Sequence, residues 1–133
     1  MKWSEKYATG NAEIDAQHKT LFESTEEFRE ALEGNCSSET FRGFLEFLRL
    51  YTEIHFCFEG ECMLASHCPA AKQNQTEHEA FTEFVETEYA EFRKNGFDRA
   101  RAATLLDTID AWLDSHILRI DTQLRETNDN SAA

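Results

Sequence analysis

Residues 55–63 lie inside a long pattern typical of a helix and read His55-Phe56-Cys57-Phe58-Glu59-Gly60-Glu61-Cys62-Met63. His55 and Glu59 are four residues apart, so on a helix they stand about 40° from each other and one turn apart. An imidazole and a carboxylate that point at one object are the usual beginning of a transition-metal site. One such pair is a weak signal, because a histidine at the edge of a core beside a solvated glutamate has the same spacing. A metal site therefore requires partners elsewhere in the chain.

The composition favours an all-α fold in a single domain spanning residues 1–133. Of the 133 residues, 41% are hydrophobic and 11 are Phe, whereas only one is Pro and five are Gly, so few residues interrupt helices. The net charge of −13 argues against nucleic acid or an anionic membrane as a partner. No apolar run is long enough to span a membrane, and the N-terminus lacks the pattern of a signal peptide. We expect a cytoplasmic protein, either a monomer or a weak homo-oligomer.

The four cysteines are expected to be reduced thiols. They are Cys36, Cys57, Cys62 and Cys68, and no two of them form a Cys-x-x-Cys motif. A long helical chain without a signal peptide does not need a disulfide framework. The missing motif also disfavours a zinc knuckle.

Hydrophobic periodicity predicts an antiparallel, up-down-up-down bundle of four helices. Gly34 is placed to stop the first helix, Ser37 or Ser38 and Asp98 to cap the second and fourth, and Pro69 to stand in the first turn of the third. An irregular N-terminal arm precedes the bundle and a polar, frayed tail follows it. The expected segments are the arm 1–11, the helices 12–32, 38–65, 69–94 and 98–125, and the tail 126–133.

Each predicted helix carries one histidine on its apolar face, namely His18, His55, His78 and His116. A single inward histidine is more often a satisfied core residue, but four of them together with carboxylates indicate a metal. Imidazole and carboxylate donors suit iron, manganese or zinc, whereas calcium prefers oxygen alone. With Glu59 and Asp121 there are six donor groups, more than one ion normally takes in a bundle core, so we predict a dinuclear centre. Asp121 has the poorest geometry, because five residues after His116 it is about 140° round an ideal helix.

These residues resemble the signature of the hemerythrin family in order and spacing, over nearly the whole chain. The matching segments are Ile14-Asp15-Ala16-Gln17-His18-Lys19, His55-Phe56-x-x-Glu59, Glu77-His78-Glu79-Ala80-Phe81 and His116-Ile117-x-x-x-Asp121. The resemblance implies a carboxylate-bridged pair of iron ions (Fe²⁺/Fe³⁺) with an oxo or hydroxo bridge.

By the same resemblance, His18 and His55 bind one iron, His78 and His116 bind the other, and Glu59 and Asp121 bridge the two. Dioxygen, or another small diatomic ligand, then binds reversibly to the iron that has only two histidines. Large apolar side chains are expected to keep water out of this pocket: Phe22, Phe56, Phe58, Phe81 and Trp112.

One position departs from the family pattern. The family has a second histidine four residues before His78, where this chain has Asn74. Three outcomes are open: the Asn74 amide oxygen coordinates weakly, a water held by Asn74 fills the gap, or another residue replaces the histidine. His67, Cys68 and Cys62 are the candidate replacements. Gly60 also stands where the family has an acidic residue.

Three functions follow from these residues. The first is a protein that binds dioxygen without being an enzyme, for storage, delivery or sensing. The second is a di-iron enzyme that activates dioxygen, peroxide or nitric oxide, because Asn74 leaves an exchangeable position on one iron. A third function is a binding or sensor module whose metal state changes a partner surface, but no exposed apolar stripe for a partner is evident in the sequence. A purely structural bundle would not require four inward histidines.

Overall fold

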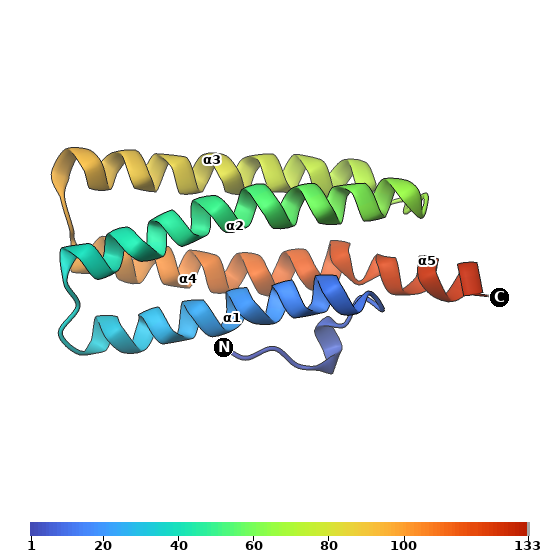
Figure 1. Ribbon diagram of the computed structural model, residues 1–133, viewed down its shortest axis with the longest axis horizontal. Helices are drawn as coiled ribbons and strands as arrows, with labels where there is room; N and C mark the ends of the chain where they lie inside the picture. The colour runs from blue at the N-terminus through green and yellow to red at the C-terminus, as the bar shows by residue number, and fades with distance from the viewer. Residues whose placement is uncertain (133) are drawn as a thin grey trace.

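The computed structural model describes the backbone of residues 1–132 and the side chains of residues 1–127. A short 3₁₀ turn precedes the bundle, and one turn of π-helix interrupts its last long segment (Figure 1). The elements are η1 (Glu5–Tyr7), α1 (Ala12–Glu33), α2 (Ser38–Ala65), α3 (Ala71–Asn95), α4 (Arg99–His116), η2 (Ile117–Asp121) and α5 (Gln123–Ala132).

The four long helices run in alternating directions along one axis, as Figure 1 shows by their colours. α2 packs against α3 and α1, and α1 packs against α4. Within residues 1–132 there is no β-strand. The predicted all-α four-helix bundle is confirmed.

Helix ends follow the sequence signals at most positions. The side chains of Asn11, Ser37 and Asp98 accept hydrogen bonds from backbone N–H groups in the first turns of α1, α2 and α4. Gly34 ends α1 as expected, and Gly96 ends α3 with a φ of 79°, a conformation that favours glycine.

The expected place of Pro69 in the first turn of α3 is wrong. α3 begins at Ala71 with Ala70 as its N-cap, so Pro69 lies in the turn before the helix. The same turn contains His67 at a φ of 56°, in the left-handed region. Residues 69 and 70, which the sequence pattern assigned to the start of the third helix, therefore belong to this turn.

The predicted fourth helix, 98–125, is not continuous. α4 ends at His116, and the backbone N–H of Thr122 donates to the carbonyl oxygen of Ile117, five residues earlier, at 3.0 Å. This i to i−5 bond is the mark of a π-turn. α5 then carries the helical backbone through Ala132, over most of the segment expected to be a frayed tail; Ala133 lies outside the described residues.

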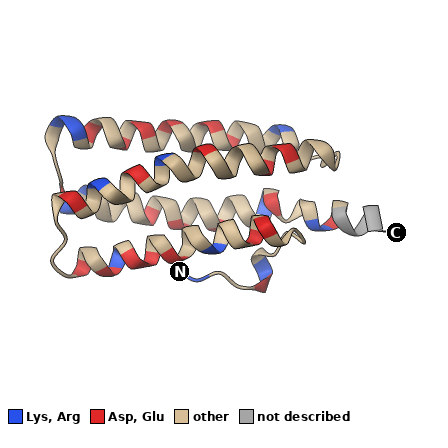
Figure 2. Ribbon diagram, viewed as in Figure 1, with Lys and Arg blue, Asp and Glu red and all other residues tan. Residues whose placement is uncertain are grey.

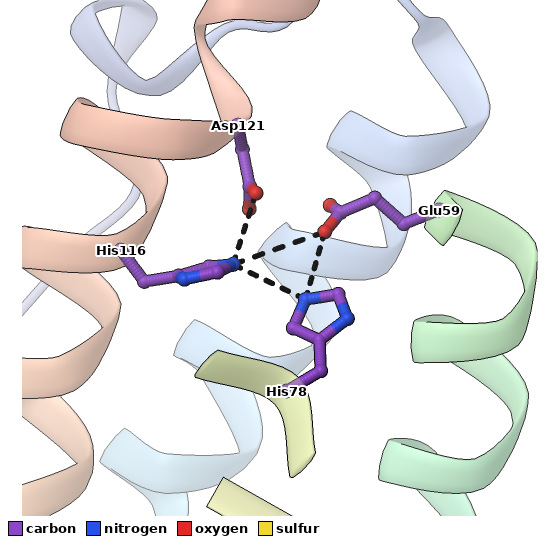
Figure 3. Close-up of side chains that lie close together, drawn as sticks. All are labelled: Glu59, His78, His116 and Asp121. Atoms are coloured by element: carbon purple, nitrogen blue, oxygen red, sulfur yellow. Dashed lines mark hydrogen bonds and ion pairs between the residues drawn. The ribbon is translucent and has the colours of Figure 1, made fainter. Parts of the chain in front are cut away.

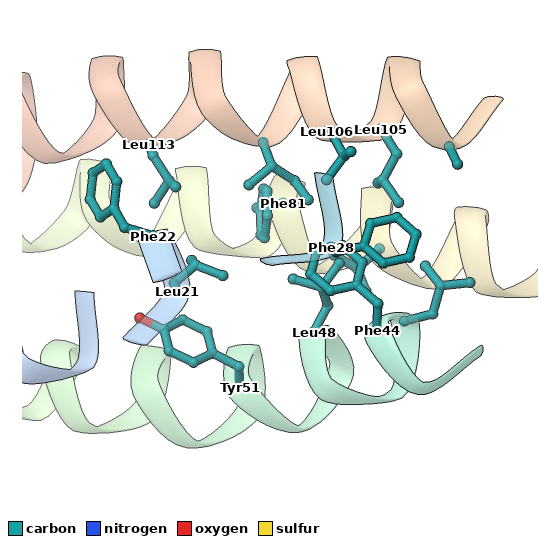
Figure 4. Packing of buried hydrophobic residues seen from close by; sticks show 14 of the residues in the cluster. Leu21, Phe22, Phe28, Phe44, Leu48, Tyr51, Phe81, Leu105, Leu106 and Leu113 are labelled. Carbon is teal, nitrogen blue, oxygen red and sulfur yellow. The ribbon is translucent and has the colours of Figure 1, made fainter. Parts of the chain in front are cut away.

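The larger cluster of buried apolar side chains packs between the four long helices (Figure 4). A smaller, separate cluster consists of Ile14, Met63, Cys68, Ala70, Ile120 and Leu124. The Phe28 and Phe44 rings stack with their centroids 4.5 Å apart, and Leu45 and Leu48 are fully buried beside them. The N-terminal arm packs on this core through Tyr7, whose hydroxyl donates to Asp114 Oδ1 at 2.7 Å. The arm thereby closes one side of the bundle.

Acidic side chains are spread along all four long helices, with Lys and Arg between them (Figure 2). In the described part of the chain, no helix combines the length and apolar character needed to cross a membrane.

Truncating a core leucine is expected to destabilise the fold far more than truncating an exposed one on the same helix. Leu48 is 0% exposed and Leu50 is 58% exposed, both in α2. Leu48→Ala should lower the free energy of unfolding by about 2–5 kcal/mol, because it removes buried methyl groups and leaves a cavity. Leu50→Ala should change it by less than about 0.5 kcal/mol. Urea unfolding of both variants measures this, and equal effects would contradict the packing described.

Candidate metal centre

The six side chains predicted as metal ligands converge at one place in the bundle core. His18 comes from α1, His55 and Glu59 from α2, and His78 from α3, while His116 ends α4 and Asp121 ends η2. All six are buried, with exposures of 6% or less. Figure 3 shows four of them pointing toward one another, from α2, α3, α4 and η2: Glu59, His78, His116 and Asp121.

The Glu59 carboxylate is divided between two pairs of histidines. Its Oε2 atom lies 3.1 Å from His18 Nε2 and 3.3 Å from His55 Nε2. Its Oε1 atom lies 3.0 Å from His78 Nε2 and 3.9 Å from His116 Nε2. One carboxylate therefore faces two separate sets of nitrogen donors.

Asp121 repeats this division from the opposite side. Its Oδ2 atom is 3.2 Å from His18 Nε2, and its Oδ1 atom is 3.0 Å from His116 Nε2. The π-turn explains how Asp121 reaches this position despite its spacing from His116. Fewer than 100° separate successive residues in a π-turn, so a side chain five residues on returns toward the same face.

The donor set fits two metal ions held by shared carboxylates. The possible ligand atoms form two clusters, one with His18 and His55 and the other with His78, His116 and Asp121, and Glu59 belongs to both. Asp121 Oδ2 is buried and has His18 Nε2, at 3.2 Å, as its ion-pair partner, so both atoms face the site that a cation would occupy. Two imidazoles and two carboxylate oxygens per site suit a borderline metal such as iron.

Two histidines are oriented by a hydrogen bond on their other ring nitrogen. His116 Nδ1–H donates to Glu77 Oε1 at 2.9 Å, and His55 Nδ1–H donates to Gln17 Oε1 at 2.5 Å. Each bond leaves the Nε2 lone pair directed at the centre, the arrangement seen around metal-binding histidines. Glu77 is in turn held by Arg119 Nη2 at 2.9 Å.

Sequence reasoning did not assign these roles to Gln17 and Glu77. Each stands directly before a predicted ligand, His18 and His78 respectively, yet each supports a histidine on a different helix. Periodicity within one helix carries no signal for such a contact. Glutamine or glutamate next to an inward histidine is the one local hint.

We call the site of His78 and His116 the second metal site. Asn74 is a fifth polar side chain there, beside these two histidines, Glu59 and Asp121. It is 1% exposed, and the amide atom that faces the site lies 3.0 Å from His78 Nε2, His116 Nε2 and Glu59 Oε1 and 3.2 Å from Asp121 Oδ1. Without a metal this atom is the amide nitrogen, which donates to the two carboxylates, because an oxygen there would face only acceptors. The other candidate replacements do not join the site. His67 is exposed, Cys62 is half-buried beside Asn11, and Cys68 lies in a separate apolar cluster.

Aromatic rings cover the histidines. The Phe56 ring stacks on His78 with centroids 3.7 Å apart, and the Trp112 ring stacks on His116 at 4.3 Å. His18 and His55 border a small cavity that is too narrow for a water molecule. Its other walls are mainly apolar and include Leu21, Phe56, Trp112, Leu113 and Ile117.

Shared carboxylates raise the pKa values of two histidines, His18 and His116, in the metal-free chain. Burial by itself lowers the pKa of His18, but hydrogen bonds and charge attraction from Asp121 and Glu59 outweigh it and raise this pKa to about 9. For His116 burial is again outweighed, by the same two carboxylates and Glu77, and the pKa rises to about 10. Burial raises the pKa of Glu59, yet its four histidine partners hold it well below the usual range.

Comparison with known proteins agrees with this geometry. Residues 9–126 match the family model described as the hemerythrin HHE cation binding domain. A protein named bacteriohemerythrin from Clostridium acetobutylicum is 23% identical over 125 residues, which cover 91% of this chain and 95% of that protein. Because the family model covers most of the chain, this protein is a member of the hemerythrin family.

Proposed function

We propose that this protein binds dioxygen reversibly at a di-iron centre held by His18, His55, His78 and His116 and bridged by Glu59 and Asp121. The observation that carries the proposal is the division of both carboxylates, each with one oxygen toward each histidine set. Together with an oxo or hydroxo bridge, this set fits two irons. Two ferrous ions held there would supply the two electrons that bind dioxygen and would recover them on its release.

The surroundings of His18 and His55 support dioxygen binding on their side of the centre. Two imidazoles, Glu59 Oε2 and Asp121 Oδ2 would supply four donors to a metal there, so even with a solvent bridge an iron would keep a free position for dioxygen. The walls of the adjoining space are mainly apolar. An apolar wall of this kind favours release of dioxygen unchanged over loss of a reduced product.

Gln17 and Glu77 would keep the imidazoles in the metal-binding tautomer. Each accepts the Nδ1 proton of one histidine, so the proton stays away from the metal-facing Nε2 atom. Arg119 balances the charge of Glu77 at the edge of the site. These contacts hold the rings in place before a metal arrives.

Asn74 favours a second candidate function, a di-iron enzyme that activates dioxygen, peroxide or nitric oxide. A carboxamide oxygen is a weaker partner for iron than the imidazole of the family pattern. The metal beside His78 and His116 would then have an exchangeable position, which a carrier does not need. Multiple turnovers with a supplied reductant would separate this function from reversible binding.

The first prediction concerns metal content and the response to oxygen. Protein loaded anaerobically with Fe²⁺ should hold two irons per chain and gain a visible charge-transfer band on adding oxygen, which disappears on deoxygenation. His18→Asn should lose iron and the band, because it removes a buried donor to one site. His67→Asn is the matched control, since His67 is exposed and asparagine tolerates its positive φ. One iron per chain, or equal loss in both variants, would refute the di-iron proposal.

Restoring histidine at position 74 tests the enzyme alternative. If the Asn74 amide makes one site exchangeable, Asn74→His should raise iron content per chain and slow autoxidation, because imidazole binds iron more firmly than a carboxamide. Iron analysis and the decay of the oxygenated spectrum measure the two effects. No change in either would eliminate a functional role for this substitution.

The stability of the metal-free protein should fall as the pH rises from about 7 to 10. His18 and His116 have folded pKa values of about 9 and about 10, above their ordinary value of 6.5. Their contribution to the free energy of unfolding is therefore complete below about pH 6.5, where both histidines are protonated in the folded and the unfolded chain. It is lost as the pH rises through the folded pKa values of about 9 and about 10. Urea unfolding of chelator-treated protein measures this slope. Glu59→Gln should flatten it, and a stability that rises with pH would contradict the assignment.

A further inference from the structure

A surface pocket of about 680 Å³ lies between α2 and α3, beside the candidate metal centre. Asn74 and His78 contribute to its lining, while Phe56, Gly60 and Leu64 line it from α2. Of the six proposed ligands, His78 is the one that lines this pocket, and it is 6% exposed. The pocket therefore borders the second metal site, away from the small cavity beside His18 and His55.

The position of Asn74 is that of a metal ligand. Donors about 2.1 Å from an octahedral metal lie about 3 Å apart when adjacent and about 4.2 Å apart when opposite. The Asn74 amide atom that faces the site is 3.0–3.2 Å from all four neighbouring donors, and His116 Nε2 stands 3.9 Å from Glu59 Oε1. Half a rotation of the carboxamide would exchange its nitrogen for its oxygen at this position, so Asn74 could offer an oxygen to a metal held by these four donors.

An asparagine at this position makes a replaceable ligand. Carboxamide oxygens suit hard ions, whereas imidazole nitrogens suit iron and cobalt, so a neutral nitrogen donor can displace the amide. The size of the pocket falls within the range of sites for organic ligands, about 300–1,000 Å³. A diatomic gas does not require such a volume.

The lining indicates what kind of molecule would fit. Apolar groups from Phe56, Leu64 and Cys68 dominate it, and Leu64 is 70% exposed. Glu61, Glu79 and Lys72 are the charged lining residues, so the local charge is negative, in a chain whose net charge is −13. Both observations disfavour an anion and favour an uncharged ligand.

Gly60 leaves part of this space open. A Cβ atom at position 60 would meet nothing within 4 Å, and the same holds for Gly43, nearer the N-terminus of α2. Only Gly60 lines the pocket. The two glycines therefore provide a matched pair, in which a larger side chain fills the pocket at one position and open surface at the other.

We propose that the α2–α3 pocket binds an uncharged organic molecule that replaces the Asn74 amide on the metal beside His78 and His116. The ligand class is an apolar or aromatic body carrying one neutral nitrogen or oxygen donor. This inference rests on the two-metal centre proposed above. It adds a second ligand site, distinct from the dioxygen position on the metal beside His18 and His55.

The test uses protein loaded with Co²⁺, titrated with imidazole and with 4-phenylimidazole, and followed by the ligand-field absorption of the metal. The phenyl compound should bind at least about tenfold more tightly, because its ring fills the pocket. Gly60→Leu should remove this preference, whereas Gly43→Leu should retain it. Both substitutions replace a mid-helix glycine by a better helix former, so both variants should fold.

Asn74→His locates the response. A histidine ligand at position 74 should abolish the spectral change with both compounds, since the exchangeable position is then filled. A retained response in Asn74→His, an unchanged preference in Gly60→Leu, or no binding by protein that holds two cobalt ions would each overturn the pocket proposal alone. Fewer than two cobalt ions per chain would instead overturn the two-metal centre, and the pocket proposal with it.

Discussion

The structure depends on one buried carboxylate that faces four histidines. Glu59 is fully buried, and its two oxygens lie within 3.0–3.9 Å of histidines from α1, α2, α3 and α4. An isolated charge in such a place would cost many kcal/mol, so the surrounding donors or a cation must compensate it. All four long helices must therefore be in register before Glu59 can be buried. The apolar clusters of the bundle supply the burial energy that makes this possible.

The π-turn follows from the same requirement. A regular helix would direct Asp121 away from His116, and the centre would then lose one of its two shared carboxylates. The wider turn at Ile117–Asp121 brings Asp121 Oδ1 to 3.0 Å from His116 Nε2, while Ile117 and Ile120 remain buried. π-turns are uncommon and frequently lie at functional sites. The local departure from α-helical geometry thus brings Asp121 to the other donors, and the apolar side chains of the same turn still pack in the core.

Much of the fold and five of the six clustered residues could be predicted from helical periodicity, whereas Asp121 depended on the family resemblance. The seams of the helices follow a 3.6-residue period, and Asn11, Ser37 and Asp98 have side chains that suit helix starts. Pro69 was misplaced because a turn and a first helical residue share the same preference. The π-turn has no local signature in residues 117–121. Gln17 and Glu77 act across helices, so their roles required three-dimensional distances.

Asn74 and Gly60 both depart from the family pattern, and both line the pocket between α2 and α3. Asparagine and histidine both bring a neutral donor, so the substitution leaves the formal charge of the site unchanged. What would change is the strength of the bond to a metal and, through the missing side chain at position 60, the space beside it. In the proposed centre, the side of His18 and His55 is closed by rings and aliphatic groups, and the side of His78 borders a pocket that Asn74 also lines. Two metals between the same pair of carboxylates would therefore differ in access and in ease of exchange.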